Sequence, residues 1–205
     1  RNPLAAMRAS AHVIGVALNH NQARARRAVQ RIDRGIVRCD HIIDELLDYT
    51  RIRDLDPTAT FLDEWLDEVI GEQDMPDRVR VARECGLSGA TAMFDPNRLR
   101  RAVINVFDNA CQAMVEDEDD SGDHCLTVRT HQSDGWIEIE FQDDGSRIPP
   151  DIEARIFEPL FSTKGFGVGL GLPVVKQIME QHGGTVEVET EPGRGTRVRL
   201  RLPRR

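Results

Sequence analysis

Apolar residues near the start of the chain recur at alternating intervals of three and four residues. The first run with this spacing consists of Leu4, Met7, Ala11, Ile14 and Leu18. The second run consists of Ala25, Val29, Ile32, Ile36, Cys39, Ile43 and Leu46, and the polar triplet Asn19-His20-Asn21 separates the two. Because this is the period of helices that supercoil around one another, the pattern predicts a hairpin of two helices.

A hairpin of two helices leaves much of each apolar stripe exposed to water. Two copies of the hairpin can bury both stripes by associating into a four-helix bundle, so the pattern predicts a homodimer formed through residues 4–50. The alternative is a monomeric hairpin that packs against the rest of its own chain.

The pattern changes after Asp56-Pro57, because proline cannot continue a helix. We therefore assign residues 1–56 to the helical hairpin and residues 57–205 to a second domain. Beyond the boundary the sequence predicts helices over 62–70, 96–115 and 168–182, and strands over 79–81, 91–94, 126–131, 136–141, 185–190 and 196–202. Asp95 is the expected N-cap of the second of these helices, and Gly183-Gly184 is expected to end the third. The elements predict an α+β sandwich, with helices on one face of a mixed sheet.

Composition and charge narrow the class of protein. The formal net charge of −8 argues against a nucleic-acid partner, since nucleic-acid binders usually show a basic face. No apolar run is long enough to span a membrane, and the start Arg1-Asn2-Pro3 is not a signal peptide, so we expect no membrane segment in this chain and a cytoplasmic location. The four cysteines form no C-x-x-C pair, which indicates neither a zinc site nor a disulfide framework.

Asn105 and Asn109 are the first candidates for chemistry. They are four residues apart in the predicted helix 96–115, so they share one helix face. Side-chain amide oxygens can complete a magnesium shell whose other ligands are phosphate oxygens and water. Alternatively, the two side chains only satisfy buried backbone groups.

The segment Asp143-Asp144-Gly145 follows directly after a predicted strand. A carboxylate at a strand end can accept a hydrogen bond from an exocyclic amine such as that of adenine. Gly145 would let the backbone come close to a flat base. An ordinary Asp-Gly turn is the alternative interpretation.

Two later segments complete the set of candidates for chemistry. Residues 156–164 place Phe157 and Phe161 around a proline, where they would pin one end of a mobile segment or simply pack in the core. Residues 165–172 contain alternate glycines at the start of a helix, and their backbone N–H groups favour phosphate. No strand immediately precedes these glycines and no Walker sequence is present, so neither a Rossmann fingerprint nor a P-loop is indicated.

The order and spacing of these four segments resemble the N, G1, F and G2 boxes of the GHKL ATPases, the superfamily of histidine kinases and DNA gyrase. The end of the chain, from Gly195-Thr196 to Pro203, resembles the histidine-kinase C-terminus, and its start resembles the later part of the phosphoacceptor box H-E-x-R-N-P-L. Gln112 and the short stretch from Phe161 to Gly167 are most similar to the nitrogen-regulation and oxygen-sensing kinases. The resemblance covers nearly the whole chain and implies a helical hairpin followed by a GHKL-type ATP-binding sandwich.

The resemblance also implies a role for each matching residue. Asp143 would bind the adenine amine, and Thr196 would assist through water. Asn109 would ligate magnesium, and Asn105 would support the metal and the phosphates. The other nucleotide-binding positions would be Gly145, Gly167, Gly169, Leu170 and Gly171. Lys164 and the glycines at 167, 169 and 171 would form a lid over the phosphates. Asn2 falls at the position linked to phosphatase activity toward the partner response regulator.

The resemblance further implies a reaction and its partners. A sensor histidine kinase core binds Mg-ATP, transfers the γ-phosphate to a histidine on the hairpin and passes it to an aspartate of a response-regulator receiver domain. A sensor domain would lie upstream. GHKL enzymes that hydrolyse ATP usually carry a glutamate where this chain has Asn105. Because asparagine cannot take a proton from water at neutral pH, the site is expected to hold ATP for another nucleophile.

Two features depart from the family pattern. Arg147 stands where the G1 box usually has its second glycine; at positive φ it would cost about 1 kcal/mol or more of strain, unless its guanidinium serves to reach a phosphate. The box histidine would lie just before Arg1, so we expect the chain as given to bind nucleotide without labelling itself on histidine. The main alternative is therefore a degenerate kinase that serves as a nucleotide-binding scaffold without phosphotransfer. A GHKL serine kinase that controls a sigma factor is a second alternative, which the long heptad hairpin disfavours.

Overall fold

The computed structural model describes residues 54–87, 89–115, 122–163, 169–191 and 195–204, together with single positions between Ala11 and Leu46. The chain divides into two compact units. Residues 1–52 belong to the first, and residues 53–163 and 169–205 form the second. In the part of the chain that the structure describes, no helix is both long and apolar enough to cross a membrane.

In the first unit, every described position is helical, as the spacing of apolar residues predicts. Ala11 and Ile36 are only 4% and 5% exposed, whereas Ile14, Ile32 and Leu46 are 53%, 55% and 47% exposed. A single chain therefore covers only part of its own apolar stripes. The predicted break at 19–21 lies outside the described residues.

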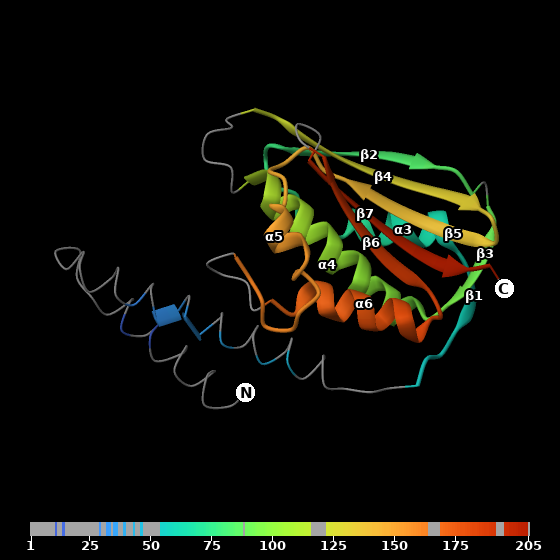
Figure 1. Ribbon diagram of the computed structural model, residues 1–205, viewed down its shortest axis with the longest axis horizontal. Helices are drawn as coiled ribbons and strands as arrows, with labels where there is room; N and C mark the ends of the chain where they lie inside the picture. Colours follow the sequence, from blue (N-terminus) through green and yellow to red (C-terminus); the bar gives the residue numbers. More distant parts are fainter. Residues whose placement is uncertain are drawn as a thin grey trace. The chain divides into compact units, whose positions relative to one another are not determined.

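A five-stranded sheet with the order β2-β4-β5-β7-β6 forms the second unit (Figure 1). Its strands are β2 (Val79–Cys85), β4 (His124–Ser133), β5 (Trp136–Gln142), β6 (Thr185–Glu191) and β7 (Gly195–Pro203). β2 pairs with β4 in parallel and all other neighbours are antiparallel, so the sheet is mixed, as predicted. Strand β2 extends four residues beyond the predicted range of 79–81.

Three helices, α3 (Leu62–Gly71), α4 (Pro96–Val115) and α6 (Gly171–Gln181), lie on one face of this sheet (Figure 1). The core lies between the helices and the sheet. Along β5 the inward residues Ile137, Ile139 and Phe141 are at most 2% exposed. They alternate with acidic or polar residues on the other face, because successive side chains of a strand point to opposite sides. The predicted α+β class is confirmed.

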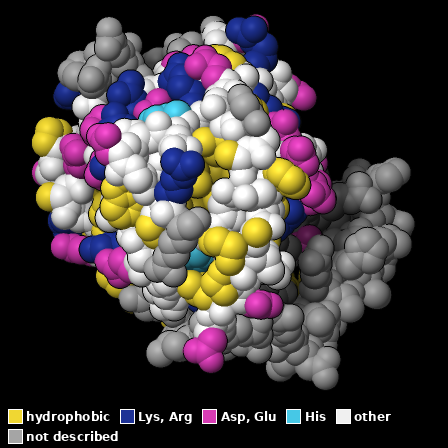
Figure 2. Space-filling model, turned by 90° about the vertical axis from the view of Figure 1, so that its right-hand side faces the viewer, with side chains coloured by type: hydrophobic (Ala, Val, Ile, Leu, Met, Phe, Trp, Pro, Cys, Tyr) yellow, Lys and Arg dark blue, Asp and Glu magenta, His cyan; other side chains and the backbone are white. Residues whose placement is uncertain are grey.

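A separate two-stranded ribbon joins β1 (Thr58–Phe61) to β3 (Thr91–Phe94) in antiparallel register. Strand β1 and the short helix α5 (Pro150–Glu153) were not predicted, because each is only four residues long and largely exposed. On one face of the ribbon, Phe61 and Met93 are 50% and 41% exposed. Hydrophobic side chains are accordingly visible on the side of the molecule shown in Figure 2.

Helix α4 has the predicted bounds because Asp95 caps it. The Asp95 Oδ1 atom accepts hydrogen bonds from the backbone N–H groups of Asn97 and Arg98, at 3.0 and 3.1 Å. Such a cap satisfies donors that have no partner within the helix. The same residue is tied to α6, because its backbone N–H donates to Nε2 of the buried His182 at 3.0 Å. His182 Nδ1 then donates to the Ile178 carbonyl at 2.7 Å, which makes the histidine a neutral structural link.

Helix α6 begins later than predicted, at Gly171 rather than at residue 168. The reason is Gly169, whose φ of +75° is left-handed and cannot belong to a right-handed helix. Val168 itself lies outside the described residues. The predicted end is confirmed, since the Gly183 and Gly184 N–H groups donate to the Glu180 and Met179 carbonyls.

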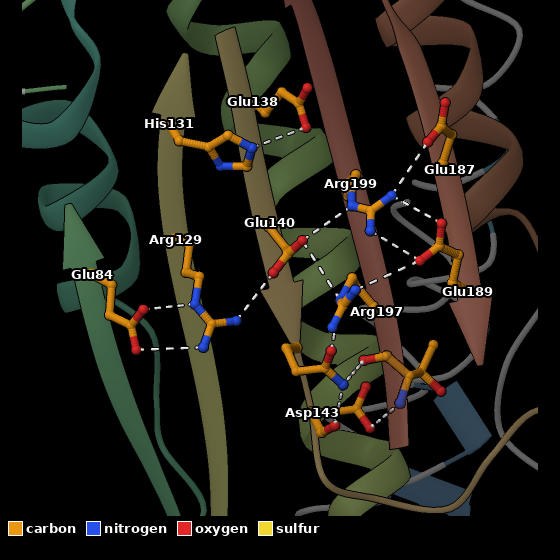
Figure 3. A network of polar contacts seen from close by, with 12 residues as sticks. Glu84, Arg129, His131, Glu138, Glu140, Asp143, Glu187, Glu189, Arg197 and Arg199 are labelled. Carbon is orange, nitrogen blue, oxygen red and sulfur yellow. Dashed lines mark hydrogen bonds and ion pairs between the residues drawn. The ribbon is translucent and has the colours of Figure 1, made fainter. Parts of the chain in front are cut away.

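The face of the sheet away from the helices carries a lattice of ion pairs (Figure 3). One row crosses all five strands in register, with alternating charge, and consists of Glu84, Arg129, Glu140, Arg199 and Glu187. In this row Glu140 accepts from Arg129 at 3.1 Å and from Arg199 at 3.1 Å. Opposite charges on directly paired residues stabilise neighbouring strands.

Glu140 is the centre of this lattice and is only 7% exposed. Burial raises its pKa, but hydrogen bonds from Arg199 and Arg129 and the charge of Arg197 outweigh burial, so that the pKa lies below its usual value of 4.5. A carboxyl whose pKa is lower in the folded than in the unfolded state stabilises the fold above its unfolded pKa. That contribution is lost as the pH falls through the folded pKa.

Replacing Glu140 by Gln should therefore lower the free energy of unfolding by about 1–2 kcal/mol at pH 7. Urea denaturation of both proteins between pH 3 and pH 7 would measure this. The difference between them should shrink as the pH falls below the usual value of 4.5 and through the lowered pKa of Glu140, where the carboxylate becomes protonated. A difference that stays constant down to pH 3 would contradict the assigned role of Glu140.

Candidate functional site

Asp143, the first residue after β5, is a buried carboxylate with only 4% exposure. Its Oδ1 atom accepts from the backbone N–H groups of Gly145 at 3.0 Å and Thr196 at 3.2 Å. The Asp143 N–H donates in turn to the Thr196 carbonyl at 3.0 Å. Such bonds offset the cost of burying a charge. They hold the carboxylate in one orientation between β5 and the start of β7.

Two glycines permit this arrangement. Gly195 has a φ of +72°, and a Cβ atom added to it would lie 2.2 Å from the Asp143 carbonyl oxygen. A Cβ added to Gly145 would lie 2.8 Å from backbone atoms of Ala113 in α4. The close approach that Gly145 permits here is therefore to helix α4. Sequence reasoning did not select Gly195, although its place beside Thr196 in a hairpin turn was an available signal.

The Thr196 hydroxyl is buried and has no hydrogen-bond partner in the described part of the chain. Buried polar groups normally have partners, so an orphan hydroxyl beside Asp143 indicates a place for a ligand or a water molecule. Nearby, burial raises the pKa of the Cys111 thiol to about 11, and the negative charges of Asp108 and Asp143 add to the effect. The thiol therefore stays neutral at physiological pH.

The asparagine pair lies next to the start of α6. A Cβ atom added to Gly171 would lie 3.5 Å from Asn105 Oδ1 and 3.7 Å from Asn109 Nδ2. Both asparagines are half-buried. No side chain caps the first turn of α6, whose N-terminus therefore offers backbone N–H groups and the positive end of the helix dipole next to two amides. This combination suits a phosphate group.

In the segment between α5 and α6, the residues around Leu160 and Phe161 contact Gly169. The Leu160 N–H donates to the Gly169 carbonyl at 3.0 Å, and a Cβ added to Gly169 would lie 2.2 Å from the Phe161 carbonyl oxygen. The Arg155 guanidinium lies over the Phe161 ring, 4.0 Å from its centroid. The backbone of Phe161 thus lies against Gly169, and its ring lies against Arg155. Leu160 adopts a left-handed φ of +65° and is 66% exposed.

The remaining candidates divide into three groups. Lys164, Gly167 and Asn2 lie outside the described residues. Leu170 is 1% exposed, so its side chain packs in the core. Arg147 is exposed and does not have a left-handed φ, so the strain considered for this departure from the family pattern is not present.

Comparison with known families identifies both parts of the chain. Residues 94–205 match the family described as "Histidine kinase-, DNA gyrase B-, and HSP90-like ATPase", and residues 1–55 match the "His Kinase A (phospho-acceptor) domain". The first match covers more than half of the chain. The chain belongs to the histidine kinase branch of this ATPase family and has its α+β fold.

Curated relatives are sensor kinases. The chain is 41% identical over 110 residues to the sensor histidine kinase ZraS of Escherichia coli O157:H7. The aligned region covers 53% of this chain and 22% of ZraS. It is 26% identical over 210 residues to the sensor protein FixL of Bradyrhizobium diazoefficiens, which covers 98% of this chain and 41% of FixL. The chain thus spans less than half the length of either relative.

Solved structures share the fold. Full-length ShkA in complex with AMPPNP superposes with a TM-score of 0.78 at 22% identity, over 100% of this chain and 43% of ShkA. Histidine kinase ThkA in complex with response regulator protein TrrA superposes with a TM-score of 0.74 at 21% identity, over 100% of this chain and 58% of that chain.

Gly195→Ala should destabilise the protein more than Gly135→Ala. Both glycines have positive φ, at +72° and +85°, but an added Cβ meets nothing within 4 Å at Gly135 and clashes with Asp143 at Gly195. We expect a loss of about 1 kcal/mol for Gly135→Ala and about 2–4 kcal/mol for Gly195→Ala in urea denaturation. Equal losses would show that the contact between Gly195 and Asp143 is not tight.

Proposed function

We propose that the chain is the catalytic core of a sensor histidine kinase. It binds Mg-ATP, transfers the γ-phosphate to a histidine of the helical hairpin, and passes the phosphate to an aspartate of a response regulator. We propose residues 1–56 as the dimerisation and phosphotransfer hairpin and residues 57–205 as the ATP-binding domain.

One observation carries the proposal: a single compact unit holds a recognition group for each end of the nucleotide. Asp143, held by two backbone N–H groups beside the orphan hydroxyl of Thr196, suits the exocyclic amine of adenine. The start of α6, beside Asn105 and Asn109, suits the phosphates. The family match to ATPases and the AMPPNP complex of ShkA support the same ligand.

Magnesium fits the phosphate end of this site. Among the described residues no group of three or more His, Cys, Asp or Glu could hold a metal by itself. Asn109 would therefore hold magnesium jointly with phosphate oxygens and water, where the ion would neutralise phosphate charge. The glycines at 167 and 169 and Lys164 would close over the phosphates.

The nature of Asn105 decides which nucleophile the bound ATP meets. An amide cannot act as the base that activates water, so the site favours transfer to an imidazole over hydrolysis. In that transfer a bond forms between the imidazole nitrogen and the γ-phosphorus, while the bond to the leaving oxygen of ADP breaks. A second transfer to a receiver carboxylate restores the histidine, and Asn2 would act in the separate phosphatase reaction, in which water takes the phosphoryl group from the receiver aspartate and inorganic phosphate leaves.

The partners follow from this chemistry. A receiver domain is supported by the complex of ThkA with TrrA, and a second copy of this chain by the exposed stripe of Ile14, Ile32 and Leu46. A sensor domain would belong to the longer protein. Since ATP and receiver domains are cytoplasmic, we propose that this core acts there.

A nucleotide-binding scaffold without phosphotransfer is the alternative function. Two departures favoured it, Arg147 in the G1 box and the phosphoacceptor histidine expected just before Arg1; of these, Arg147 is exposed and has no left-handed φ, so it no longer favours the scaffold. Kinase activity is therefore the better-supported proposal.

Asp143→Asn should weaken ADP binding by at least about tenfold, because an amide presents a donor as well as an acceptor to the adenine amine. Isothermal titration calorimetry with Mg-ADP would measure this, with the exposed Asp151→Asn as the control. The variant should stay folded, since an asparagine Oδ1 can still accept from Gly145 and Thr196. Unchanged affinity would refute the adenine assignment.

Ile32→Glu combined with Leu46→Glu should convert the dimer into monomers. Both side chains are about half exposed in one chain, so a charge there disturbs the contact between chains more than the hairpin itself. Ile36 is a poorer choice, because it is already buried within the chain. Light scattering would report the mass, with Gly35→Ala, which meets nothing within 4 Å, as the control. A monomeric unmutated chain would refute the bundle.

A further inference from the structure

Gln142, the last residue of β5, contacts both segments that form the candidate adenine site. Its Nε2 atom donates to the Asp143 carbonyl at 3.0 Å and to the Thr196 carbonyl at 3.3 Å. The Thr196 carbonyl is the same atom that accepts the Asp143 N–H. One side-chain amide thus fastens the end of β5 to the start of β7, directly behind the Asp143 carboxylate.

The contacts of Gln142 require both halves of an amide. Its Oε1 atom accepts from Arg197 Nε at 2.8 Å, while its NH2 group serves the two carbonyls. A carboxylate in this place would keep the bond to Arg197 but would have no hydrogen for the carbonyls. It would also place a second negative charge next to Asp143.

Arg197 connects this amide to the charge lattice. It lies opposite Gln142 in the register of β5 and β7. Its Nε atom is 3.6 Å from Glu140 Oε2, and its Nη1 atom is 3.7 Å from Glu189 Oε2. Figure 3 shows the lattice continuing from Glu140 through Arg197 toward Asp143. The guanidinium is therefore held on three sides, and it holds the Gln142 amide in turn.

We propose that Gln142 is a positioning residue for nucleotide binding, through which the ion-pair lattice on the outer face of the sheet orients the Asp143 carboxylate. This inference rests on the proposed function, since it assumes that Asp143 recognises adenine. Gln142 lies on the face of the sheet away from the helices and acts on the nucleotide only through Asp143 and Thr196. Because the Gln142 NH2 group donates to two carbonyls, we expect the site to require a hydrogen-bond donor at this position.

The test compares Mg-ADP affinity by calorimetry at pH 8.0 for the unmutated chain, Gln142→Glu and Gln142→Met. Gln132→Glu is the matched control, since it makes the same chemical change at an exposed glutamine of β4 in the same sheet. Thermal melting of each variant shows that it is folded.

At pH 8.0 both Gln142 variants should bind Mg-ADP about tenfold more weakly than the unmutated chain. This is the change in affinity expected from the loss of one or two hydrogen bonds. The control should bind with unchanged affinity. Gln142→Glu keeps the bond to Arg197 and lacks only the donor, so its weakening shows what the donor contributes.

The inference and the function it rests on can fail separately. If the unmutated chain binds Mg-ADP and Asp143→Asn does not, but both Gln142 variants bind normally, the positioning role is wrong and the adenine assignment stands. Normal binding by Gln142→Glu alone would also overturn the positioning role, because a donor would then not be what matters. If the unmutated chain binds no Mg-ADP, both proposals fail. Should Gln142→Glu not fold, Gln142→Met with its control decides the question.

Discussion

A carboxylate taken out of water must meet hydrogen-bond donors, and the region around Asp143 is arranged by that demand. Two backbone N–H groups meet its Oδ1 atom, one from the following turn and one from Thr196 at the start of β7. Bringing these segments together requires glycine at 145 and 195, because an added Cβ would strike backbone at either place. The junction between the end of β5 and the start of β7, the turn onto α4 and the candidate adenine site therefore meet at one buried carboxylate.

The two faces of the sheet contribute differently to this arrangement. The face under α3, α4 and α6 is apolar and supplies the core. The other face carries Glu and Arg on alternate strands, so that Glu140 lies between the guanidinium groups of Arg129 and Arg199. Glu140 is kept ionised there in spite of burial. Because the lattice ends at Arg197 and Gln142, stability of the outer face and orientation of the site are parts of one network.

Local signals explain which elements were predictable. Helix α4 was predicted over its full length, because Asp95, Pro96 and twenty residues of helical periodicity lie together in the sequence. Strand β1 was missed, since its four residues become a strand only through pairing with β3, more than thirty residues later. The start of α6 was placed too early, because the left-handed φ of Gly169 follows from its contact with Phe161.

The sequence alone determined the α+β class, the family, and the residue types expected to meet adenine, phosphate and magnesium, because spacing and side-chain chemistry are properties of the chain itself. Only the tertiary structure decided how those residues are supported. That Gly195 must lack a side chain, that Gly145 lies against α4, and that Gln142 secures Asp143 to Thr196 are facts about segments distant in sequence. Such contacts form only when the sheet brings β5 and β7 side by side, and no local pattern encodes them.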